Sequence, residues 1–317
     1  MKIVIPGGSG QVGTLLARTF HDGGHAVVVL SRQPQPAPWK VVAWDAATLG
    51  PWAAELEGTD AVINLAGRSI NCRYTPANRR AIVGSRVDSV RAVGQAVARA
   101  AQPPRVWLQA GTATIYAHRY DAPNDEANGL MAEGNEPNAP ETWRFANGVA
   151  TAWEGAFAEF KPPHTRQVMV RTTMVMSPSR GGVFDLMVGL ARRGLGGRMG
   201  DGRQYISWIH GDDFARAILW LIEHGELSGP FNLGAPHPLP NAEFMADLRA
   251  AAGVRFGLPA AAWMLEIGAF FMRTETELIL KSRNVIPGRL LESGFKFNFP
   301  KWPEAAQDLY RRWRETE

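Results

Sequence analysis

Cysteine and lysine are both scarce in this sequence. Cys72 is the only cysteine among 317 residues, which excludes an internal disulfide and a metal site built on cysteine ligands. Only six of the 34 basic residues are lysines, and none of the six lies between residues 41 and 160. Long apolar runs are missing too, since the most apolar late segment, residues 258–272, contains Glu266 and is shorter than the roughly 20 residues that cross a bilayer. We therefore expect no membrane partner.

Charge of one sign is not in large excess either. The net charge is +4, and the basic residues are scattered without a run of five or six, which disfavours nucleic acid as a partner. The seven histidines show no metal-ligand spacing, so we predict no metal site. The chain starts directly in an apolar, strand-like run, which is not typical of a signal peptide. These features predict a cytoplasmic protein whose partner is a small-molecule substrate.

What the sequence does have is a glycine-rich turn within MKIVIPGGSGQVG, between an apolar run at residues 3–5 and a helical pattern. The spacing Gly7-x-x-Gly10-x-x-Gly13 lets a tight turn bring the backbone onto a pyrophosphate. The amides that open the following helix, together with its dipole, favour an anion. A glycine-rich turn without a ligand is the alternative, but the position between a strand and a helix favours a dinucleotide site.

Short β-branched runs then alternate with helical patterns, which predicts a Rossmann-type, doubly wound parallel α/β sheet with helices on both faces. We expect a dinucleotide-binding domain over residues 1–170, completed by parts of 203–235. A smaller substrate or lid domain is expected over 171–317, mostly helical from about residue 240, with one helix over 260–272. The expected strands are residues 3–5, 26–30, 41–44, 61–65, 106–110, 167–170, 205–210 and 231–233.

The end of the second expected strand indicates which nicotinamide cofactor the site takes. A site that prefers NAD places Asp or Glu there, whereas the 2′-phosphate of NADP requires that this acid be absent and favours arginine. No acid occurs from residue 23 to residue 44, and Arg32 follows the glycine turn by about 20 residues. Arg32 can bind a phosphate through two N–H groups, and Ser31 can add a hydroxyl donor. The sequence therefore predicts NADP(H), with a solvated surface role for Arg32 as the alternative.

These motifs resemble a known family. The order GGSGQVG, LSR and Asn64-Leu65-Ala66-Gly67 is similar to that of the extended and atypical short-chain dehydrogenase/reductases, which include nucleotide-sugar epimerases and dehydratases. More narrowly, the chain resembles the epimerase family proteins that carry a small, distinctive C-terminal domain. The segments that carry this second resemblance are residues 83–86, 153–154, 196–202, 207–210, 227–230, 241–244 and 289–295.

The resemblance implies which residues bind the cofactor. The pyrophosphate would lie against the glycine turn and the 2′-phosphate against the end of the second strand. Asp45 would lie near the adenine amine, residues 65–67 along the nicotinamide-side ribose, and Arg86 near a cofactor phosphate. Asp45 as a turn cap and Arg86 in an ion pair are the structural alternatives. The full predicted cofactor set is Gly7, Ser9, Gly10, Gln11, Val12, Gly13, Ser31, Arg32, Asp45, Leu65, Ala66, Gly67, Arg86 and Gly111.

The catalytic pair that this family usually carries is absent. Its redox enzymes use Tyr-x-x-x-Lys, in which the lysine ammonium lowers the pKa of the tyrosine from about 10 so that the hydroxyl can exchange a proton near neutral pH. None of the five tyrosines is followed four residues later by lysine. By the resemblance, the two positions fall near Ala146 and Ala150 instead.

Three other residues are candidates for catalysis. The stretch QAGTATIY at 109–116 resembles the family's serine-rich strand end and places Thr112 at the hydroxyl position beside the nicotinamide. Tyr116 is a candidate proton donor if an arginine supplies the missing charge, and Glu126 lies where relatives often place an acid. Each has a structural alternative: Thr112 as a strand-end cap, Tyr116 as a packed aromatic, and Glu126 as a solvated loop residue.

Two functions follow from these predictions. The first is an NADP(H)-dependent oxidoreductase or epimerase that acts on a hydroxyl or carbonyl carbon of a small, sugar-like or phosphorylated metabolite. The second is a non-catalytic NADP(H)-binding redox sensor or scaffold protein, which the missing tyrosine–lysine pair favours. The resemblance also implies a monomer or a homodimer, the latter paired through the helices expected near 79–100 and 144–160.

Overall fold

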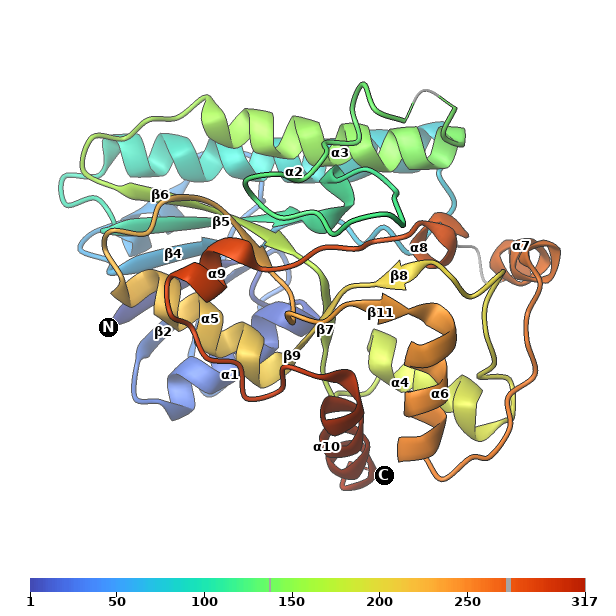
Figure 1. The fold of residues 1–317 in the computed structure, drawn as a ribbon. Coiled ribbons are helices and arrows are strands. Elements are labelled where there is room, and N and C mark those ends of the chain that lie inside the picture. The colour runs from blue at the N-terminus through green and yellow to red at the C-terminus, as the bar shows by residue number, and fades with distance from the viewer. Residues whose placement is uncertain (137, 272–274, 317) are drawn as a thin grey trace.

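A seven-stranded parallel sheet forms the centre of the computed structural model, which describes residues 1–136, 138–271 and 275–316 (Figure 1). In spatial order its strands are β10 (Gly229–Leu233), β6 (Arg166–Thr172), β5 (Val106–Thr112), β4 (Ala61–Asn64), β1 (Lys2–Pro6), β2 (Ala26–Ser31) and β3 (Lys40–Ala43). Every neighbouring pair is parallel. The predicted fold class, a Rossmann-type doubly wound sheet with a helical C-terminal region, is confirmed.

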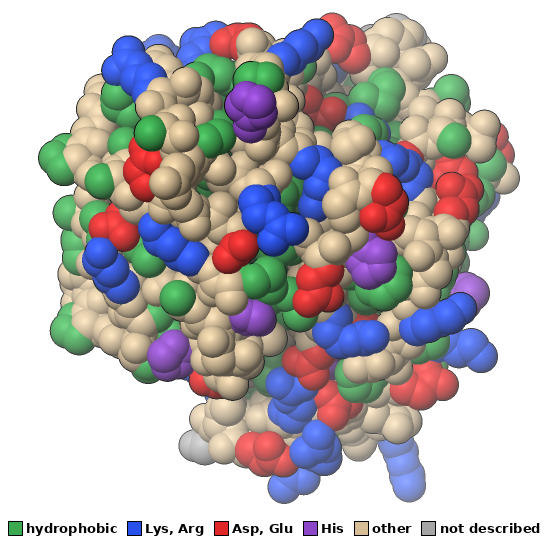
Figure 2. All heavy atoms as spheres, turned by 90° about the vertical axis from the view of Figure 1, so that its left-hand side faces the viewer, with side chains coloured by type: hydrophobic (Ala, Val, Ile, Leu, Met, Phe, Trp, Pro, Cys, Tyr) green, Lys and Arg blue, Asp and Glu red, His purple; other side chains and the backbone are tan. Residues whose placement is uncertain are grey.

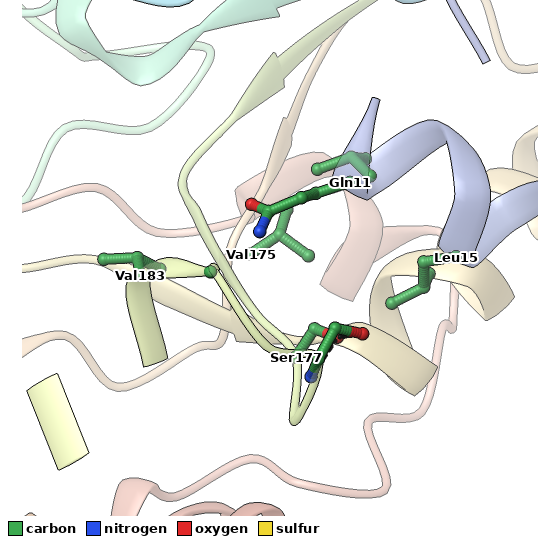
Figure 3. Close-up of a pocket in the computed structure, with 8 residues that line it drawn as sticks. Gln11, Leu15, Val175, Ser177 and Val183 are labelled. Atoms are coloured by element: carbon green, nitrogen blue, oxygen red, sulfur yellow. Dashed lines mark hydrogen bonds between the residues drawn. The ribbon is translucent and has the colours of Figure 1, made fainter. Parts of the chain in front are cut away.

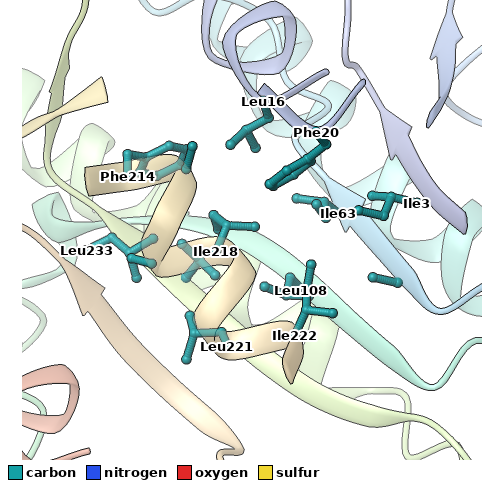
Figure 4. Packing of buried hydrophobic residues seen from close by; sticks show 14 of the residues in the cluster. Ile3, Leu16, Phe20, Ile63, Leu108, Phe214, Ile218, Leu221, Ile222 and Leu233 are labelled. Carbon is teal, nitrogen blue, oxygen red and sulfur yellow. The ribbon is translucent and has the colours of Figure 1, made fainter. Parts of the chain in front are cut away.

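Helices cover both faces of this sheet. The four main ones are α1 (Gln11–Asp22), α2 (Pro76–Arg99), α3 (Glu141–Ala158) and α5 (Gly211–Glu223). On the face that α1 and α5 cover, Phe20 and Ile218 pack with Leu108 of the sheet (Figure 4). On the face of α2 and α3, Phe157 packs edge-on against Trp107, with ring centroids 4.7 Å apart. The strands are apolar on both sides because both sides are covered.

The C-terminal half has a core of its own. Trp302 stacks on Phe244 with ring centroids 3.9 Å apart and contacts Trp208 at 4.9 Å, and all three side chains are buried. The elements around this core are β7 (Met174–Met176), α4 (Val183–Arg192), β8 (Tyr205–Ile206), β9 (Trp208–His210), β11 (Leu239–Pro240), α6 (Asn241–Ala251) and α10 (Trp302–Arg314). The other short elements of the chain are η1 (Pro51–Leu56), η2 (Ala113–Ile115), α7 (Ala262–Phe271), α8 (Glu277–Leu280) and α9 (Gly288–Glu292).

The boundaries of several elements differ from those predicted, for local reasons. The strand expected over 205–210 is divided at Ser207, because residues 205–206 pair with β11 and residues 208–210 pair with β7. The Ser207 hydroxyl donates to the carbonyl of Arg283 and accepts from the amide of Val285. Helix α2 begins three residues earlier than expected, since Thr75 caps it and Pro76 suits its first position. The helix expected over 260–272 begins at Ala262, and Met272 lies outside the described residues.

A connecting segment, residues 281–286, joins the C-terminal half to the Rossmann sheet. It runs between β8 and the loop after β5, as the red trace between α8 and α9 in Figure 1 shows. The amide of Arg283 donates to the carbonyl of Tyr205 (2.9 Å) on one side. On the other side, the amide of Asn124 donates to the carbonyl of Asn284 (2.7 Å) and the amide of Ile286 donates back to Asn124 (2.9 Å). The two halves therefore share a hydrogen-bonded seam beside the end of β5.

One face of the molecule carries charges of both signs (Figure 2). On the face shown in Figure 2, acidic and basic side chains are interspersed, so that face presents no continuous basic patch. None of the helices in the described part of the chain is both long and apolar enough to cross a membrane.

Candidate cofactor and active site

The glycine turn, residues 7–13, lies where β1 ends and α1 begins. Gly7 has φ +77°, and a Cβ atom there would lie 2.7 Å from the Cα of Ala66. A Cβ atom at Gly13 would lie 2.5 Å from the Cα of Gly8. Gly10 precedes α1 without a side-chain cap, so the first amides of the helix have no side chain bonded to them there. The turn therefore needs glycine at positions 7 and 13, and it leaves helix amides open to an anion.

The end of β2 lies beside this turn. Ser31 is buried, and its hydroxyl donates to the hydroxyl of Ser9 in the turn (3.1 Å). Arg32 is exposed, and within the described residues it has neither an ion pair nor a hydrogen-bond partner. Ser9, Ser31 and Arg32, which the sequence predicts at the pyrophosphate and the 2′-phosphate, thus lie at one edge of the sheet with the guanidinium free.

Asp45 follows β3 and forms an Asx turn. Its carboxylate accepts from the amides of Ala47 and Thr48, both at 2.9 Å, and from the Thr48 hydroxyl. These bonds, led by the one from the Thr48 hydroxyl, lower the pKa of Asp45 to about 2. The next residue, Ala46, has a positive φ of 64°. Asp45 therefore caps its own turn, which is the structural role considered for it in the sequence analysis. A contact with the adenine amine stays a prediction.

Residues 65–67 follow β4, and Arg86 of α2 lies over them. A Cβ atom at Gly67 would lie 3.2 Å from the guanidinium carbon of Arg86. That guanidinium donates to the carbonyls of Arg68 (2.9 Å) and Ile82 (3.1 Å) and stacks on the ring of Trp153 at 4.8 Å. Burial lowers its pKa to about 10. No carboxylate in the described residues pairs with Arg86, so a cofactor phosphate is the charge that would complete it.

A small hollow beside the glycine turn was not predicted from the sequence. Gln11 and Val12 line a small hollow together with Leu15, Val175, Ser177, Ser179, Gly182 and Val183. Figure 3 shows the Gln11 amide beside Val175 in this hollow. Helix α4 begins after Gly182, again without a side-chain cap, so a second helix N-terminus opens beside that of α1. The signal available in the sequence was the Gly181–Gly182 pair ahead of an apolar-periodic run.

Thr112 ends β5, opposite Thr172 of β6. Its hydroxyl oxygen accepts from the amide of Thr114 (3.2 Å), so Thr112 caps η2 and is half-buried. The neighbouring Gly111 has no room for a side chain, because a Cβ atom would lie 2.8 Å from the sulfur of Met169. The cap uses the oxygen of Thr112 as an acceptor and leaves its O–H free to donate.

Tyr116 is buried at 2% exposure, and its hydroxyl faces other protein groups. It accepts from the guanidinium of Arg171 (2.7 Å) and donates to the Asn232 side chain (3.0 Å). Arg171 in turn forms a two-bond ion pair with Glu154 of α3, both bonds at 2.8 Å. An arginine thus stands beside Tyr116, but burial outweighs its effect and raises the pKa of the tyrosine. The geometry matches the packed aromatic better than a proton donor near neutral pH.

Glu126 is not a solvated loop residue. Its carboxylate accepts from the amide of Asn232 in β10 (2.7 Å) and from the amide of Arg289 at the start of α9 (3.2 Å). Burial raises the pKa of Glu126. The side chain therefore ties three segments together, and a direct catalytic role stays a prediction.

The two positions of the missing catalytic pair lie on α3. Ala150 is buried against Ala113 and Tyr116. Between the two alanines, Asn147 receives a hydrogen bond of 2.6 Å from the ammonium of Lys281, which belongs to the connecting segment. Lys281 is 1% exposed, and burial lowers its pKa to about 8. The sequence did not predict this contact, because Lys281 is about 130 residues away from Asn147 in the chain. The only signal in the sequence was that lysine is rare.

The outer sides of α2 and α3 carry two intrachain ion pairs. Arg79 bonds Glu141 near one end, and Arg91 bonds Glu159 (2.7 Å) near the other. These charged pairs lie on the helices through which a homodimer is expected, and the oligomeric state stays a prediction. The described residues hold no group of three or more His, Cys, Asp or Glu side chains that can hold a metal ion.

Comparison with known proteins identifies relatives over the whole chain. The NAD dependent epimerase/dehydratase family matches residues 3–234, and a domain of unknown function (DUF1731) matches residues 260–309. Epimerase family protein SDR39U1 of Homo sapiens is 32% identical over 98% of this chain and 99% of its own length. An epimerase family protein of Staphylococcus epidermidis is 29% identical with the same coverage.

Solved structures agree with this result. The crystal structure of human SDR39U1 (isoform2) with NADPH has a TM-score of 0.85 at 30% identity, over 98% of this chain and 99% of that one. A nucleoside-diphosphate sugar epimerase from Corynebacterium glutamicum has a TM-score of 0.74 at 27% identity, over 99% of this chain and 61% of that one. The cofactor named with the human structure is the one predicted here from Ser31 and Arg32.

Proposed function

Because the chain belongs to the NAD dependent epimerase/dehydratase family, we propose that it binds NADP(H) and acts on a hydroxyl or carbonyl carbon of a small metabolite. The metabolite class that fits the relatives is sugar-like or phosphorylated. The observation that carries the proposal is the edge where β1 and β2 end. There the glycine turn leaves helix amides open, and Ser9, Ser31 and the unpaired Arg32 lie beside it.

The fit to the cofactor rests on space and charge. Side-chain atoms at Gly7 and Gly13 would collide with backbone, so the turn keeps the close approach that a pyrophosphate needs. Ser31 and Arg32 supply a hydroxyl and two N–H donors for the 2′-phosphate, and Arg86 supplies a buried positive charge without an acidic partner in the described residues. The guanidinium groups of Arg32 and Arg86 only donate hydrogen bonds, which suits an anionic ligand.

The chemistry rests on Thr112. Bound NADP(H) supplies or accepts the hydride at the substrate carbon. Thr112 holds the substrate oxygen with its free O–H and thereby stabilises the charge that develops there. Tyr116 is buried and bonded to Arg171, so the proton that the oxygen gains or loses passes to water rather than to this tyrosine. Without a dedicated acid the turnover is expected to be slow, since a positioned acid contributes about 10²–10⁴-fold.

The test begins with the cofactor. The purified protein is titrated with NADPH and with NADH, and binding is followed through the fluorescence of its eleven tryptophans. We expect NADPH to bind at least tenfold tighter. NADPH oxidation by a panel of small aldehydes, ketones and keto-sugars then tests the reaction. Equal affinity for the two cofactors, or none for either, would remove the cofactor assignment.

A second candidate function is a protein that binds NADP(H) without chemistry and signals its redox state. The observation in its favour is that no tyrosine of the chain is followed four residues later by lysine, while Tyr116 is buried. Tight binding of NADPH without oxidation by any carbonyl, together with a partner protein whose affinity differs between NADPH and NADP, would favour this candidate.

A further inference from the structure

Lys281 is a buried charge that the proposed function has not used. Its ammonium donates to the side chain of Asn147 (2.6 Å), to the carbonyl of Thr114 (3.2 Å) and to the carboxylate of Glu136 (3.4 Å). An ammonium has three N–H donors, and these three acceptors use all of them. Burial of a charged group is unfavourable unless it is fully paired, so this arrangement fixes the acceptors in place.

Two of these acceptors lie close to Thr112, the residue proposed to hold the substrate oxygen. Asn147 lies on α3 between the positions of the missing pair, and Thr114 lies in the Thr112 turn, residues 112–115. Arg283, also of the connecting segment, donates to the hydroxyl of Thr114 (3.2 Å) and pairs with the buried Glu277. The carbonyl and the hydroxyl of Thr114 are therefore both held from the C-terminal half of the chain.

Thr114 passes this constraint on to Thr112. Its amide donates to the hydroxyl oxygen of Thr112 (3.2 Å), which occupies a lone pair and turns the O–H hydrogen of Thr112 away from the cap. If the Thr112 turn moved, this bond would lengthen and the hydroxyl would rotate more freely. A misplacement of such a group by about 1 Å is enough to lower the rate about 100-fold.

We propose that Lys281 and Arg283 are positioning residues that hold the Thr112 turn, and with it the Thr112 hydroxyl, against the substrate oxygen. The C-terminal half thus completes the active site by supplying a lysine and an arginine to the part of the sheet where the family's helix lysine is missing. This inference rests on the proposed function. The role proposed for Lys281 and Arg283 differs from that of a lid over the substrate, because neither residue needs to touch the substrate.

The test is a double-mutant cycle on the full-length protein with NADPH and a carbonyl that the parent protein reduces. Lys281→Met keeps an unbranched side chain that is one atom shorter, and it removes the N–H donors. We expect it to lower kcat at least tenfold while the Kd for NADPH changes less than threefold. In a Thr112→Ala background we expect the same change to lower kcat less than twofold, because the hydroxyl that Lys281 positions is already gone. Lys296→Met, at an exposed lysine of the same half, is the matched control and should change neither constant.

A second measurement does not depend on turnover. Amide hydrogen exchange with NADPH bound should speed up at residues 112–117 in Lys281→Met and stay unchanged at residues 7–13. If Lys281→Met does not fold, Lys281→Gln keeps an N–H donor and is measured instead. Unchanged exchange at 112–117, or effects of Lys281→Met and Thr112→Ala on kcat that add, would overturn the inference while the proposed function stands. A parent protein that binds NADPH but reduces no carbonyl would overturn the proposed function and this catalytic role together.

Discussion

The glycine turn is specified mainly by the glycine spacing in one short stretch of chain, whereas the Thr112 turn is held by segments from three other parts of the sequence. In the glycine turn, backbone contacts dictate the residue types: a Cβ atom at Gly13 would meet its near neighbour Gly8, and one at Gly7 would meet Ala66. Around the Thr112 turn, the stabilising groups come from α3, β6 and the connecting segment. The glycine turn can therefore be recognised in the sequence as a motif. The Thr112 turn forms only when the chain folds, and in the sequence each of its polar side chains could equally be an exposed residue.

The largest expected effect comes from a substitution beside the Thr112 turn that leaves the glycine turn unchanged. Glu154→Ala leaves the guanidinium of Arg171 buried without its carboxylate, and we expect the free energy of unfolding to fall by about 3–5 kcal/mol. Chemical denaturation measures it. The matched control is Glu159→Ala at the C-cap of the same helix, which removes the exposed pair with Arg91 and should have a much smaller effect. Similar losses from both variants would mean that the pair beneath Tyr116 is no more important than a surface pair.

The next prediction tests the role of the Thr112 hydroxyl in carbonyl reduction. Thr112→Ala removes the free O–H and should lower kcat for carbonyl reduction by about 100-fold, the usual scale for one positioned donor to a developing oxyanion, with the Kd for NADPH unchanged. Steady-state kinetics and a binding titration measure the two constants. Thr19→Ala, the same change at an exposed site on α1, is the control. An unchanged kcat would remove Thr112 from the reaction.

A smaller effect is expected at the glycine turn and the neighbouring end of β2, where the cofactor preference is tested. Arg32→Glu places an acid where the 2′-phosphate is expected, so NADPH should bind at least tenfold more weakly, about 1.4 kcal/mol or more, while NADH is affected little or binds better. Tryptophan fluorescence measures both affinities. Arg18→Glu makes the same charge change at an exposed site on α1 and should leave the preference intact. If both variants weaken NADPH equally, the effect is one of overall charge and not of the site.

The last prediction concerns the dependence of stability on pH. The pKa of Lys281 is lowered by burial to about 8 from 10.5, so between these values the unfolded chain binds a proton that the folded chain does not. Stability rises with pH wherever the unfolded state binds more protons. The free energy of unfolding of the parent protein, relative to Lys281→Met, should therefore increase from about pH 8 to about pH 10.5. Denaturation at several pH values measures it, and a relative stability that stays flat or falls would contradict the buried charge.

The prediction from sequence was most complete where structure is local. The parallel sheet followed from β-branched runs alternating with helical patterns, and the order of strands β3-β2-β1-β4-β5-β6 agrees with a doubly wound fold. Helix α4 and strand β7 were not predicted: an apolar-periodic run does mark α4, whereas β7 has only three residues. Strand 205–210 was predicted as continuous because nothing nearby in the sequence shows that Ser207 bonds residues 283 and 285.

The candidate site divides in the same way. The sequence by itself determined the glycine turn, the absence of an acid on β2 and the absence of the tyrosine–lysine pair, since each depends on residue type at fixed spacing. Only the tertiary structure decided that Arg171 stands beside Tyr116, that Glu126 bonds β10 and α9, and that Lys281 reaches Asn147. These contacts join residues 55 to 163 positions apart. Each one depends on how distant segments pack together, and a polar group that this packing buries is costly unless it is paired.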